Sequence, residues 1–420
     1  MSAVRSFSML KDILGQAWEA MVYNRRRTAI TMIGMAWGIA TVVLLLAYGA
    51  GFARAIQSIF AQWGVNHIEV YGGRTSEQAG ADKAGVRVRL TQDDVDRIWN
   101  SVPGITSITP ALFNNETVTN DLHSYTWSVN GVRPQGLDIL VLDPAEGRLF
   151  NGLEEEQRAH VCVIGSDAKT KLFSGGYAIG ESIRLNGIMF KVVGVLQPKM
   201  VEGENNINTN IWIPFSTMGD LKDSTYLDGI WFNFRGDNEV VERNLRNTLA
   251  VAHHFRPSDH RAIFVANLQS QLHQFSIVTI ALQVLLSLVG ALTLGIAGIG
   301  LMNIMLVSVQ QRTREIGIEK ALGARRHHIL IQFLAEALAI TAIGGAAGIA
   351  LAYLVSALVG RITFYSALAK NAENADIRLL ISPSSVIVAT LILIVTGLVS
   401  GMIPALRASN LDPIEALRYE

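Results

Sequence analysis

Cysteine, charge and proline are all scarce in this chain of 420 residues. Its single cysteine, Cys162, cannot form an intramolecular disulfide, so a soluble domain must be held together by packing alone. Only 17% of the residues are charged, against about 25% in ordinary soluble proteins, which predicts surface that faces lipid. The net charge is zero, so the overall balance indicates no partner, and we expect no nucleic acid.

The sequence also lacks the motifs of common enzymes. No stretch matches the phosphate-binding pattern G-x-x-x-x-G-K-[ST], and the nearest one, Gly165 to Lys171, lacks the second glycine. There is no G-x-S-x-G, no H-E-x-x-H and no distinctive pair of carboxylates. We therefore expect no catalytic residue, no cofactor and no ATP binding by this chain alone.

A metal site is an alternative near the end of the polar region. Its candidate ligands are His253, His254, Asp259 and His260. Their spacing fits no familiar ligand pattern, which favours solvated histidines beside a helix end. We expect no metal.

Long uncharged runs are what the sequence has instead. Ala262 to Gln311 contains 50 residues without Asp, Glu, Lys or Arg. As a helix it would be ~75 Å long, against about 30 Å of hydrocarbon, so roughly half should stand outside the membrane. With the runs at Thr28–Ala53, His327–Gly360 and Leu379–Leu406, this predicts four transmembrane helices and both termini on one side.

The distribution of basic residues predicts the orientation. Arginine and lysine gather before the first span and between spans two and three: Arg5, Lys11, Arg25, Arg26, Arg27, then Arg312, Arg314, Lys320, Arg325 and Arg326. These segments belong in the cytoplasm, and the region of roughly 200 residues after span one belongs outside. A cleaved signal peptide is the alternative, but its n-region of about 27 residues would be too long.

These boundaries predict an α-helical membrane protein with four transmembrane helices and a mixed α/β extracytoplasmic domain of two lobes between spans one and two. The segments are an amphipathic interfacial helix at 1–27, transmembrane 1 at 28–53, the extracytoplasmic domain at 54–267, a stalk plus transmembrane 2 at 268–308, a cytoplasmic coupling loop at 309–328, transmembrane 3 at 329–360, a short external loop at 361–378, transmembrane 4 at 379–406 and a cytoplasmic tail at 407–420.

Short β-rich runs mark the extracytoplasmic region. The predicted strands are His67–Tyr71, Val86–Leu90, Thr126–Val132, His160–Ile164, Ser182–Leu185, Met189–Leu196, Asn210–Ile213 and Ile230–Phe234. Asn186-Gly187 predicts a hairpin turn between two of them. Helices are expected after Thr91, with Asp94 in capping-box position, and from Glu239 to about His253. We expect one lobe, at about 132–226, to be inserted in the other.

Small residues four apart occur in three of the spans, and this spacing permits close helix packing in lipid. The pairs are Gly34 with Gly38, Gly344 with Gly348, and Gly397 with Gly401. Glu336 lies about two turns into span three, where an ionised group is costly and usually finds a partner. A proton relay or substrate contact is one interpretation; a buried tether to a neighbouring helix or to an interface arginine is favoured.

The most informative segment joins spans two and three. Its charges cluster in a short predicted helix with Gly317 and Gly323 as expected bends, so that it offers an exposed knob to a cytoplasmic partner. T-R-E-I-G-I-E-K-A-L-G-A at Thr313–Ala324 resembles the signature of the MacB/FtsX-like permeases of ABC transporters. The segment Ile403–Arg418, I-P-A-L-R-A-S-N-L-D-P-I-E-A-L-R, is similar to their closing motif. Stretches at 163–166, 179–183 and 190–195 resemble their external domain.

The resemblance implies a dimeric inner-membrane permease, formed with an identical copy or a paralogue, that recruits two copies of a separate ATPase. ATP and magnesium would bind to that partner. The coupling residues would be Arg314, Glu315, Gly317, Glu319, Lys320 and Gly323. Movement of the external domain would then drive efflux of an antibiotic, peptide or lipid-linked substrate, often with a periplasmic adaptor and an outer-membrane channel.

One departure and two alternatives accompany this resemblance. Glu319 stands where an arginine is common in the family, which puts the identity of the accepted ATPase in doubt. A lipoprotein-extraction permease is one alternative and would need an exposed apolar groove. A signalling scaffold that controls an external cell-wall hydrolase is the other. The large external domain favours transport.

Overall fold

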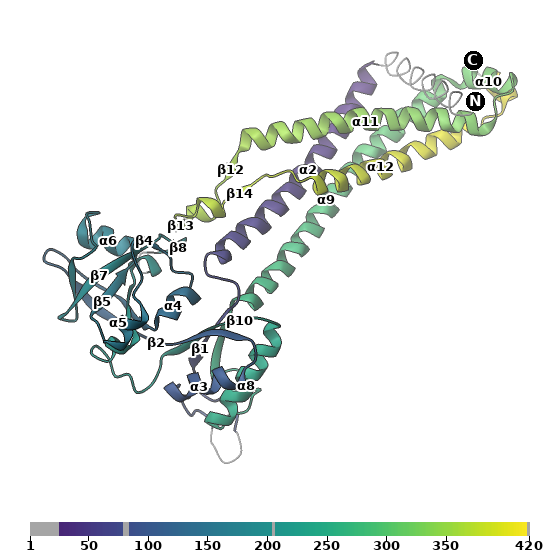
Figure 1. Cartoon of the computed structure of the whole chain (residues 1–420). Helices are drawn as coiled ribbons and strands as arrows, with labels where there is room; N and C mark the ends of the chain where they lie inside the picture. Colours follow the sequence, from purple (N-terminus) through teal and green to yellow (C-terminus); the bar gives the residue numbers. More distant parts are fainter. Residues whose placement is uncertain (1–24, 79–83, 204–205, 418–420) are drawn as a thin grey trace, which may run out of the picture. The chain divides into compact units, whose positions relative to one another are not determined.

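The computed structural model describes residues 25–78, 84–203 and 206–417. It divides into two compact units (Figure 1). A helical unit comprises residues up to 54 with 277–362 and the chain from 377 onward, and a sheet unit comprises 55–276 and 363–376. The predicted N-terminal amphipathic helix lies outside the described residues as far as residue 24.

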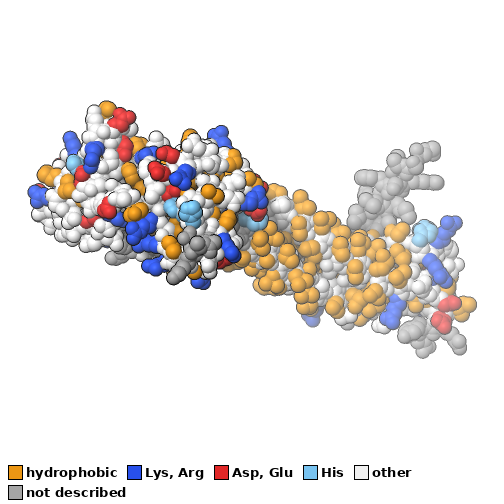
Figure 2. Space-filling model, turned by 90° about the horizontal axis from the view of Figure 1, so that it is seen from below, with side chains coloured by type: hydrophobic (Ala, Val, Ile, Leu, Met, Phe, Trp, Pro, Cys, Tyr) orange, Lys and Arg blue, Asp and Glu red, His pale blue; other side chains and the backbone are white. Residues whose placement is uncertain are grey.

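In the described residues, four helices are long and apolar enough to cross a membrane, which agrees with the predicted number of spans. They are α2 (Arg25–Ala61), α9 (Leu268–Gln311), α11 (Arg326–Val359) and α12 (Pro383–Ser409). The short helices α10 (Thr313–Ala321) and α13 (Pro413–Leu417) follow α9 and α12. Figure 2 shows hydrophobic side chains over much of the helical surface. Trp37 and Ile296 are examples, 66% and 71% exposed, as lipid-facing residues would be.

One ten-stranded sheet organises the sheet unit, in the order β11-β1-β10-β2-β3-β9-β5-β7-β4, with β6 pairing with β2 and β7. Only the β3–β9 and β5–β7 pairs are parallel among the paired strands of this sheet in the described residues. The strands are β1 (His67–Gly72), β2 (Ile105–Thr119), β3 (Ser124–Val132), β4 (Pro144–Gly147), β5 (Val161–Ile164), β6 (Ser182–Leu185), β7 (Ile188–Leu196), β9 (Ile211–Pro214), β10 (Gly229–Phe234) and β11 (Ile263–Asn267).

Short helices connect these strands: α3 (Gln92–Ser101), α4 (Pro134–Ile139), α5 (Gly152–Glu156), α6 (Ser166–Phe173), α7 (Phe215–Met218) and α8 (Asn238–His253). The predicted capping box is present, because Asp94 accepts a hydrogen bond of 2.8 Å from the Thr91 amide at the start of α3. The predicted hairpin turn lies between β6 and β7, where Asn186 and Gly187 both have positive φ.

Two apolar cores define two lobes. The first lobe forms around β1, β10, β11, α3 and α8, and Phe232 is fully buried in it. The second lobe forms around β5, β6, β7, β9 and α6, and its core takes residues from Leu112 to Met218. A third cluster joins the cores, with the rings of Trp212 and Trp231 6.3 Å apart. The second lobe thus begins within β2, upstream of the predicted 132, because that long strand contributes side chains to both cores.

The strand predictions differ from the structure in two ways. Val86–Leu90 is not a strand in the described residues; it makes single bridges, from Arg87 to Arg74 and from Leu90 to Leu227. Its alternation has the right period, but the pairing with the neighbouring residues 73–75 is limited to two backbone hydrogen bonds, from the Thr75 amide to the Val86 carbonyl and from the Val88 amide to the Gly73 carbonyl. Conversely, β2 was not predicted, because Pro110 and a run of polar residues after Phe113 interrupt its apolar pattern.

The segment between α11 and α12 is folded and is more than a linker. Its ends pair with each other as β12 (Arg361–Ile362) and β14 (Ile377–Arg378). Its middle belongs to the sheet unit, where β13 (Ala369–Lys370) pairs with β8 (Val201–Glu202). The buried Asp376 accepts hydrogen bonds from the Phe364 and Ser366 amides, at 2.9 and 3.1 Å.

Candidate coupling site between the second and third membrane helices

The short helix α10 follows α9 after a break at Arg312, whose φ of −101° and ψ of 13° are not helical. The Thr313 hydroxyl donates to two carbonyl oxygens in the last turn of α9, at 3.0 and 2.9 Å. It thus supplies a hydrogen-bond donor to carbonyl groups that have no partner within the helix. Ile316 packs into a buried cluster with residues of α9, α11 and α12. These contacts hold α10 firmly on the helical unit.

Arg312 joins α9, α10 and α11. Its guanidinium lies 3.2 Å from the Glu315 carboxylate on α10 and 3.2 Å from the Glu336 carboxylate on α11. The guanidinium carbon is also 5.6 Å from the centre of the Phe333 ring, in cation–π position. Glu336 is buried, so Arg312 compensates a charge that would otherwise be costly there. This pairing supports the interpretation of Glu336 as a tether to an interface arginine.

Lys320 points inward, in contrast to the exposed contact predicted from the sequence. Its ammonium donates to the carbonyl oxygens of Ser409, the last residue of α12, and of Leu411 just beyond it, at 2.7 and 2.5 Å. Burial lowers the pKa of Lys320 and the neighbouring Arg326 adds to this effect, while Asp412 opposes it. Lys320 therefore ties α10 to the segment that leads into α13.

The two glycines predicted as bends differ from each other. Gly323 has a φ of 102°, a conformation that favours glycine, and it ends the turn after α10. Gly317 is buried inside α10 and makes no bend. The helix is therefore continuous from Thr313 to Ala321, and the signature segment ends in the turn at Gly323.

The outward side of α10 combines charge with exposed apolar surface. Glu315, Ile318, Glu319 and Leu322 follow the i, i+3, i+4, i+7 spacing that places side chains on one side of a helix, and Arg314 is exposed next to them. We call these five residues the contact face. Leu322 is 84% and Ile318 46% exposed. Sequence reasoning identified only the charged members, although two apolar residues at this spacing in a loop helix were a usable signal.

Five of the six predicted packing glycines lie at helix contacts. Gly38 of α2 faces Leu294 of α9. On α11, Gly344 faces Met35 of α2, and Gly348 faces Ile39 and Ala36, also of α2. On α12, Gly397 faces Thr341 of α11 and Gly401 faces Ala337 of α11. Around Gly34, no atom of the described residues lies within 4 Å of an added Cβ. The prediction missed Gly290 and Gly298, which bring α9 against Val42 and Ser400.

Two of the four residues considered as metal ligands, His253 and Asp259, have other partners. The Asp259 carboxylate accepts hydrogen bonds from the Ser76 and Glu77 amides, at 2.6 and 2.9 Å. His253 lies 2.9 Å from the Asp94 carboxylate. In the described part of the chain, no group of three or more His, Cys, Asp or Glu is arranged to hold a metal.

Comparisons with known proteins agree with this architecture. A family model described as the MacB-like periplasmic core domain matches residues 28–247, and one described as the FtsX-like permease C-terminal region matches residues 287–413. The macrolide export ATP-binding/permease protein MacB of Bdellovibrio bacteriovorus is 34% identical over 97% of this chain and 61% of its own length. Its counterpart from a Shewanella species is 33% identical over 99% of this chain and 62% of its own length.

This chain thus spans about three fifths of the length of these relatives. Among solved structures, the periplasmic region of MacB from Actinobacillus actinomycetemcomitans is 19% identical, covers 53% of this chain and 98% of its own, and has a TM-score of 0.42. The two family models together match residues of both units described above. The chain is therefore a multi-pass membrane protein with a periplasmic α/β domain after its first span, and it belongs to the MacB/FtsX-like family of ABC transporter permeases.

Proposed function

We propose that this chain is the permease subunit of a MacB-type ABC transporter, in which ATP hydrolysis by a separate ATPase moves the periplasmic domain. The observation that carries the proposal is the contact face on α10. Leu322 and Ile318 expose apolar surface between charged residues, a combination typical of protein interfaces. Arg312 joins this helix to α9 and α11, so a force on the contact face reaches both membrane helices.

The helix α9 would transmit this force. Its 44 residues contain no proline and correspond to ~66 Å, about twice the hydrocarbon thickness. In the chain, α9 follows β11 without a linker. This helix, which we call the rod, therefore begins directly after a strand of the ten-stranded sheet. A rigid helix transmits displacement, whereas a flexible segment absorbs it. The proposed mechanism is therefore mechanical.

The remaining components follow from the family. We propose a dimer with a second permease, two ATPase copies that bind ATP and magnesium, and a location in the bacterial inner membrane with both termini in the cytoplasm. A periplasmic adaptor and an outer-membrane channel would complete an efflux path. The macrolide export named for its relatives supports export of an antibiotic, peptide or lipid-linked compound.

The first experiment tests the contact face. Glu315→Lys reverses a charge that would lie at the ATPase interface, where an unpaired buried charge costs several kcal/mol. We expect the variant to lose copurification with the ATPase and to lose transport while the periplasmic domain stays folded. Glu239→Lys, an exposed change on α8, is the matched control and should copurify normally. Normal copurification and transport by Glu315→Lys would remove the contact face from the interface.

A second experiment tests the rod. Val278→Pro removes a backbone hydrogen bond within α9 and costs about 3 kcal/mol locally, whereas Val278→Ala preserves the helix. Gln283→Pro is a second break five residues further along. In the proline variants, ATP hydrolysis by the assembled complex should continue while transport is lost. Normal transport by both would contradict a mechanical role for α9.

A third experiment tests where ATP binds. The purified chain should neither bind nor hydrolyse ATP, and addition of the ATPase should restore turnover. Saturable ATP binding by the chain alone would contradict the proposal.

A further inference from the structure

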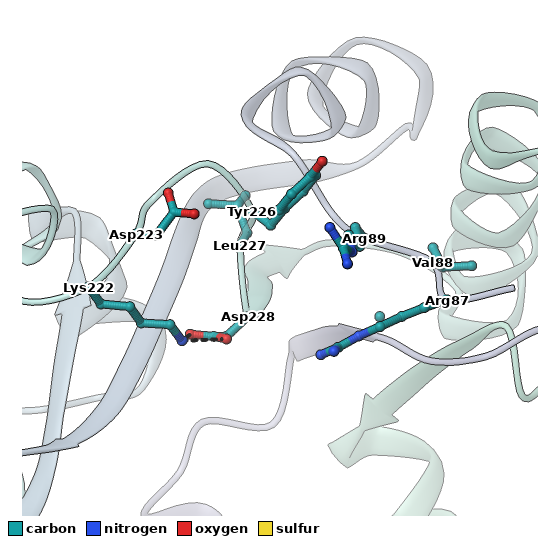
Figure 3. A pocket seen from close by; sticks show the side chains of 9 residues that line it. Arg87, Val88, Arg89, Lys222, Asp223, Tyr226, Leu227 and Asp228 are labelled. Carbon is teal, nitrogen blue, oxygen red and sulfur yellow. Dashed lines mark hydrogen bonds and ion pairs between the residues drawn. The ribbon is translucent and has the colours of Figure 1, made fainter.

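A pocket of about 270 Å³ lies between two segments of the periplasmic domain. One wall is the segment Arg87–Arg89 of the first lobe, whose Val88 is part of that lobe's core. The opposite wall is the connection Lys222–Asp228, which follows α7 and returns the chain from the second lobe to β10. Figure 3 shows Arg87 and Arg89 on one side, Lys222 and Asp228 across the space from Arg87, and Tyr226 next to Arg89.

Among the described residues, the two arginines have no carboxylate partner. Arg87 and Arg89 occupy alternate positions of an extended segment, and the intervening Val88 is buried, so both side chains lie on the solvent side. Neither forms an ion pair with any of the described residues. Arg89 instead stacks on the Tyr226 ring, 4.7 Å from its centre, which holds the guanidinium in place.

The acidic residues of the lining already have other partners. Asp228 lies 2.6 Å from the Lys222 ammonium and also accepts a hydrogen bond of 2.8 Å from the Phe113 amide. Asp223 accepts hydrogen bonds from the amide and hydroxyl of Thr225, at 3.0 and 2.6 Å. Within the part of the chain that the structure describes, the pocket therefore keeps two guanidinium groups without a carboxylate partner, and its lining has three basic and two acidic side chains.

We propose that this pocket binds a phosphate group, with Arg87 and Arg89 as its main ligands. Guanidinium groups donate two parallel hydrogen bonds to phosphate oxygens, and a tetrahedral phosphate can accept from donors on several walls at once. The volume suits a small group or a headgroup and is below the usual range for a drug-sized ligand. The phosphate belongs either to a soluble ester or to the headgroup of an anionic lipid.

Binding would connect the two lobes. Arg87 and Arg89 belong to the first lobe, whereas Lys222 follows the second-lobe helix α7 and lies at the far wall. A bound phosphate would favour the arrangement in which these walls face each other. This site does not depend on the proposed coupling, because binding is measured without an ATPase.

The test is calorimetric titration of the full chain in a non-ionic detergent at low ionic strength, where screening of exposed charges is weak. Inorganic phosphate is the first probe. Dihexanoyl phosphatidylglycerol, kept below its micelle concentration, is the second, and dihexanoyl phosphatidylcholine is the reference without net charge. We expect saturable binding at one site, weakened about tenfold or more by Arg87→Gln and by Arg89→Gln. Arg97→Gln removes an exposed charge from the same lobe outside the pocket and should change nothing.

The outcomes separate the two sources. Binding of inorganic phosphate that depends on both arginines supports a soluble phosphate ester. Arginine-dependent binding of phosphatidylglycerol alone supports a lipid headgroup. Absence of saturable binding with both probes, or equal affinity in Arg87→Gln, Arg89→Gln and Arg97→Gln, overturns the proposal. Because both arginines are exposed, the variants should keep the unfolding temperature of the parent chain, and this is checked in parallel.

Discussion

The helical unit and the periplasmic domain are held together in different ways. In the periplasmic domain, large side chains such as Phe232 and Trp212 fill continuous apolar cores. In the helical unit, the close contacts depend on glycines, and large apolar side chains such as Ile296 point outward. In the periplasmic domain, transfer of apolar side chains out of water drives their burial. Lipid is as apolar as the side chains of the helices, so in the membrane the helices are held together by close complementary packing instead. The two units should therefore respond differently to the same kind of substitution.

The largest effect is expected for a core truncation in the periplasmic domain. Phe232→Ala removes a fully buried ring and should destabilise the first lobe by about 3–5 kcal/mol. Ile296→Ala, at a position on α9 that is 71% exposed, should have little effect in detergent or lipid. Thermal unfolding of the full chain measures both. Similar losses for the two variants would mean that Ile296 is covered by a partner.

A medium effect is expected when a small residue in the helical unit becomes larger. The added Cβ of Gly348→Ala would overlap Ile39 and the Ala36 carbonyl, so α2 and α11 must separate, at a cost of about 1–3 kcal/mol. On α9, Gly300→Ala meets no atom of the described residues within 4 Å and is the matched control. Resistance to unfolding in increasing detergent is the measurement. Equal resistance of the two variants would show that the helices do not depend on this contact.

The smallest effect is a pH dependence within the periplasmic domain. The buried Lys199 ammonium donates to the carbonyls of Gln62 and Leu140 and lies 4.7 Å from the Trp63 ring centre. Burial lowers its pKa from 10.5 to about 8, although Asp143 opposes the shift. Between these two pH values the unfolded chain binds a proton that the folded chain has lost, so stability should rise with pH across this window.

Lys199→Met should remove this rise, because methionine does not titrate. Lys191→Met changes an exposed lysine of β7 and should leave the slope as it is in the parent chain. Unfolding temperatures measured from pH 8 to pH 10.5 provide the comparison. A slope that survives in Lys199→Met would assign the dependence to another group.

The sequence predicted the membrane part best, because a long charge-free run has few alternative structures. The predicted start of the stalk, Leu268, is the first residue of α9, and the Thr91 capping box and the Asn186-Gly187 turn are local signals that the structure confirms. Strand β2 was missed because polar residues interrupt its apolar pattern and because its pairing with β10 and β6 is non-local, although it also forms a hairpin with β3. The Lys320 ammonium turns inward because it donates a hydrogen bond to the Ser409 carbonyl. Ser409 lies far along the chain, and no local sequence pattern indicates such a contact.

The pairing of β13 with β8 has a consequence for how this domain can be inherited or exchanged. A recombination event that replaced only residues 55–276 would place a β8 from one ancestor beside a β13 from another. A poorly matched or unpaired β8 would expose strand edge, which invites aggregation. Successful chimeras should therefore carry residues 363–376 along with 55–276, and in natural relatives these two segments should have changed together.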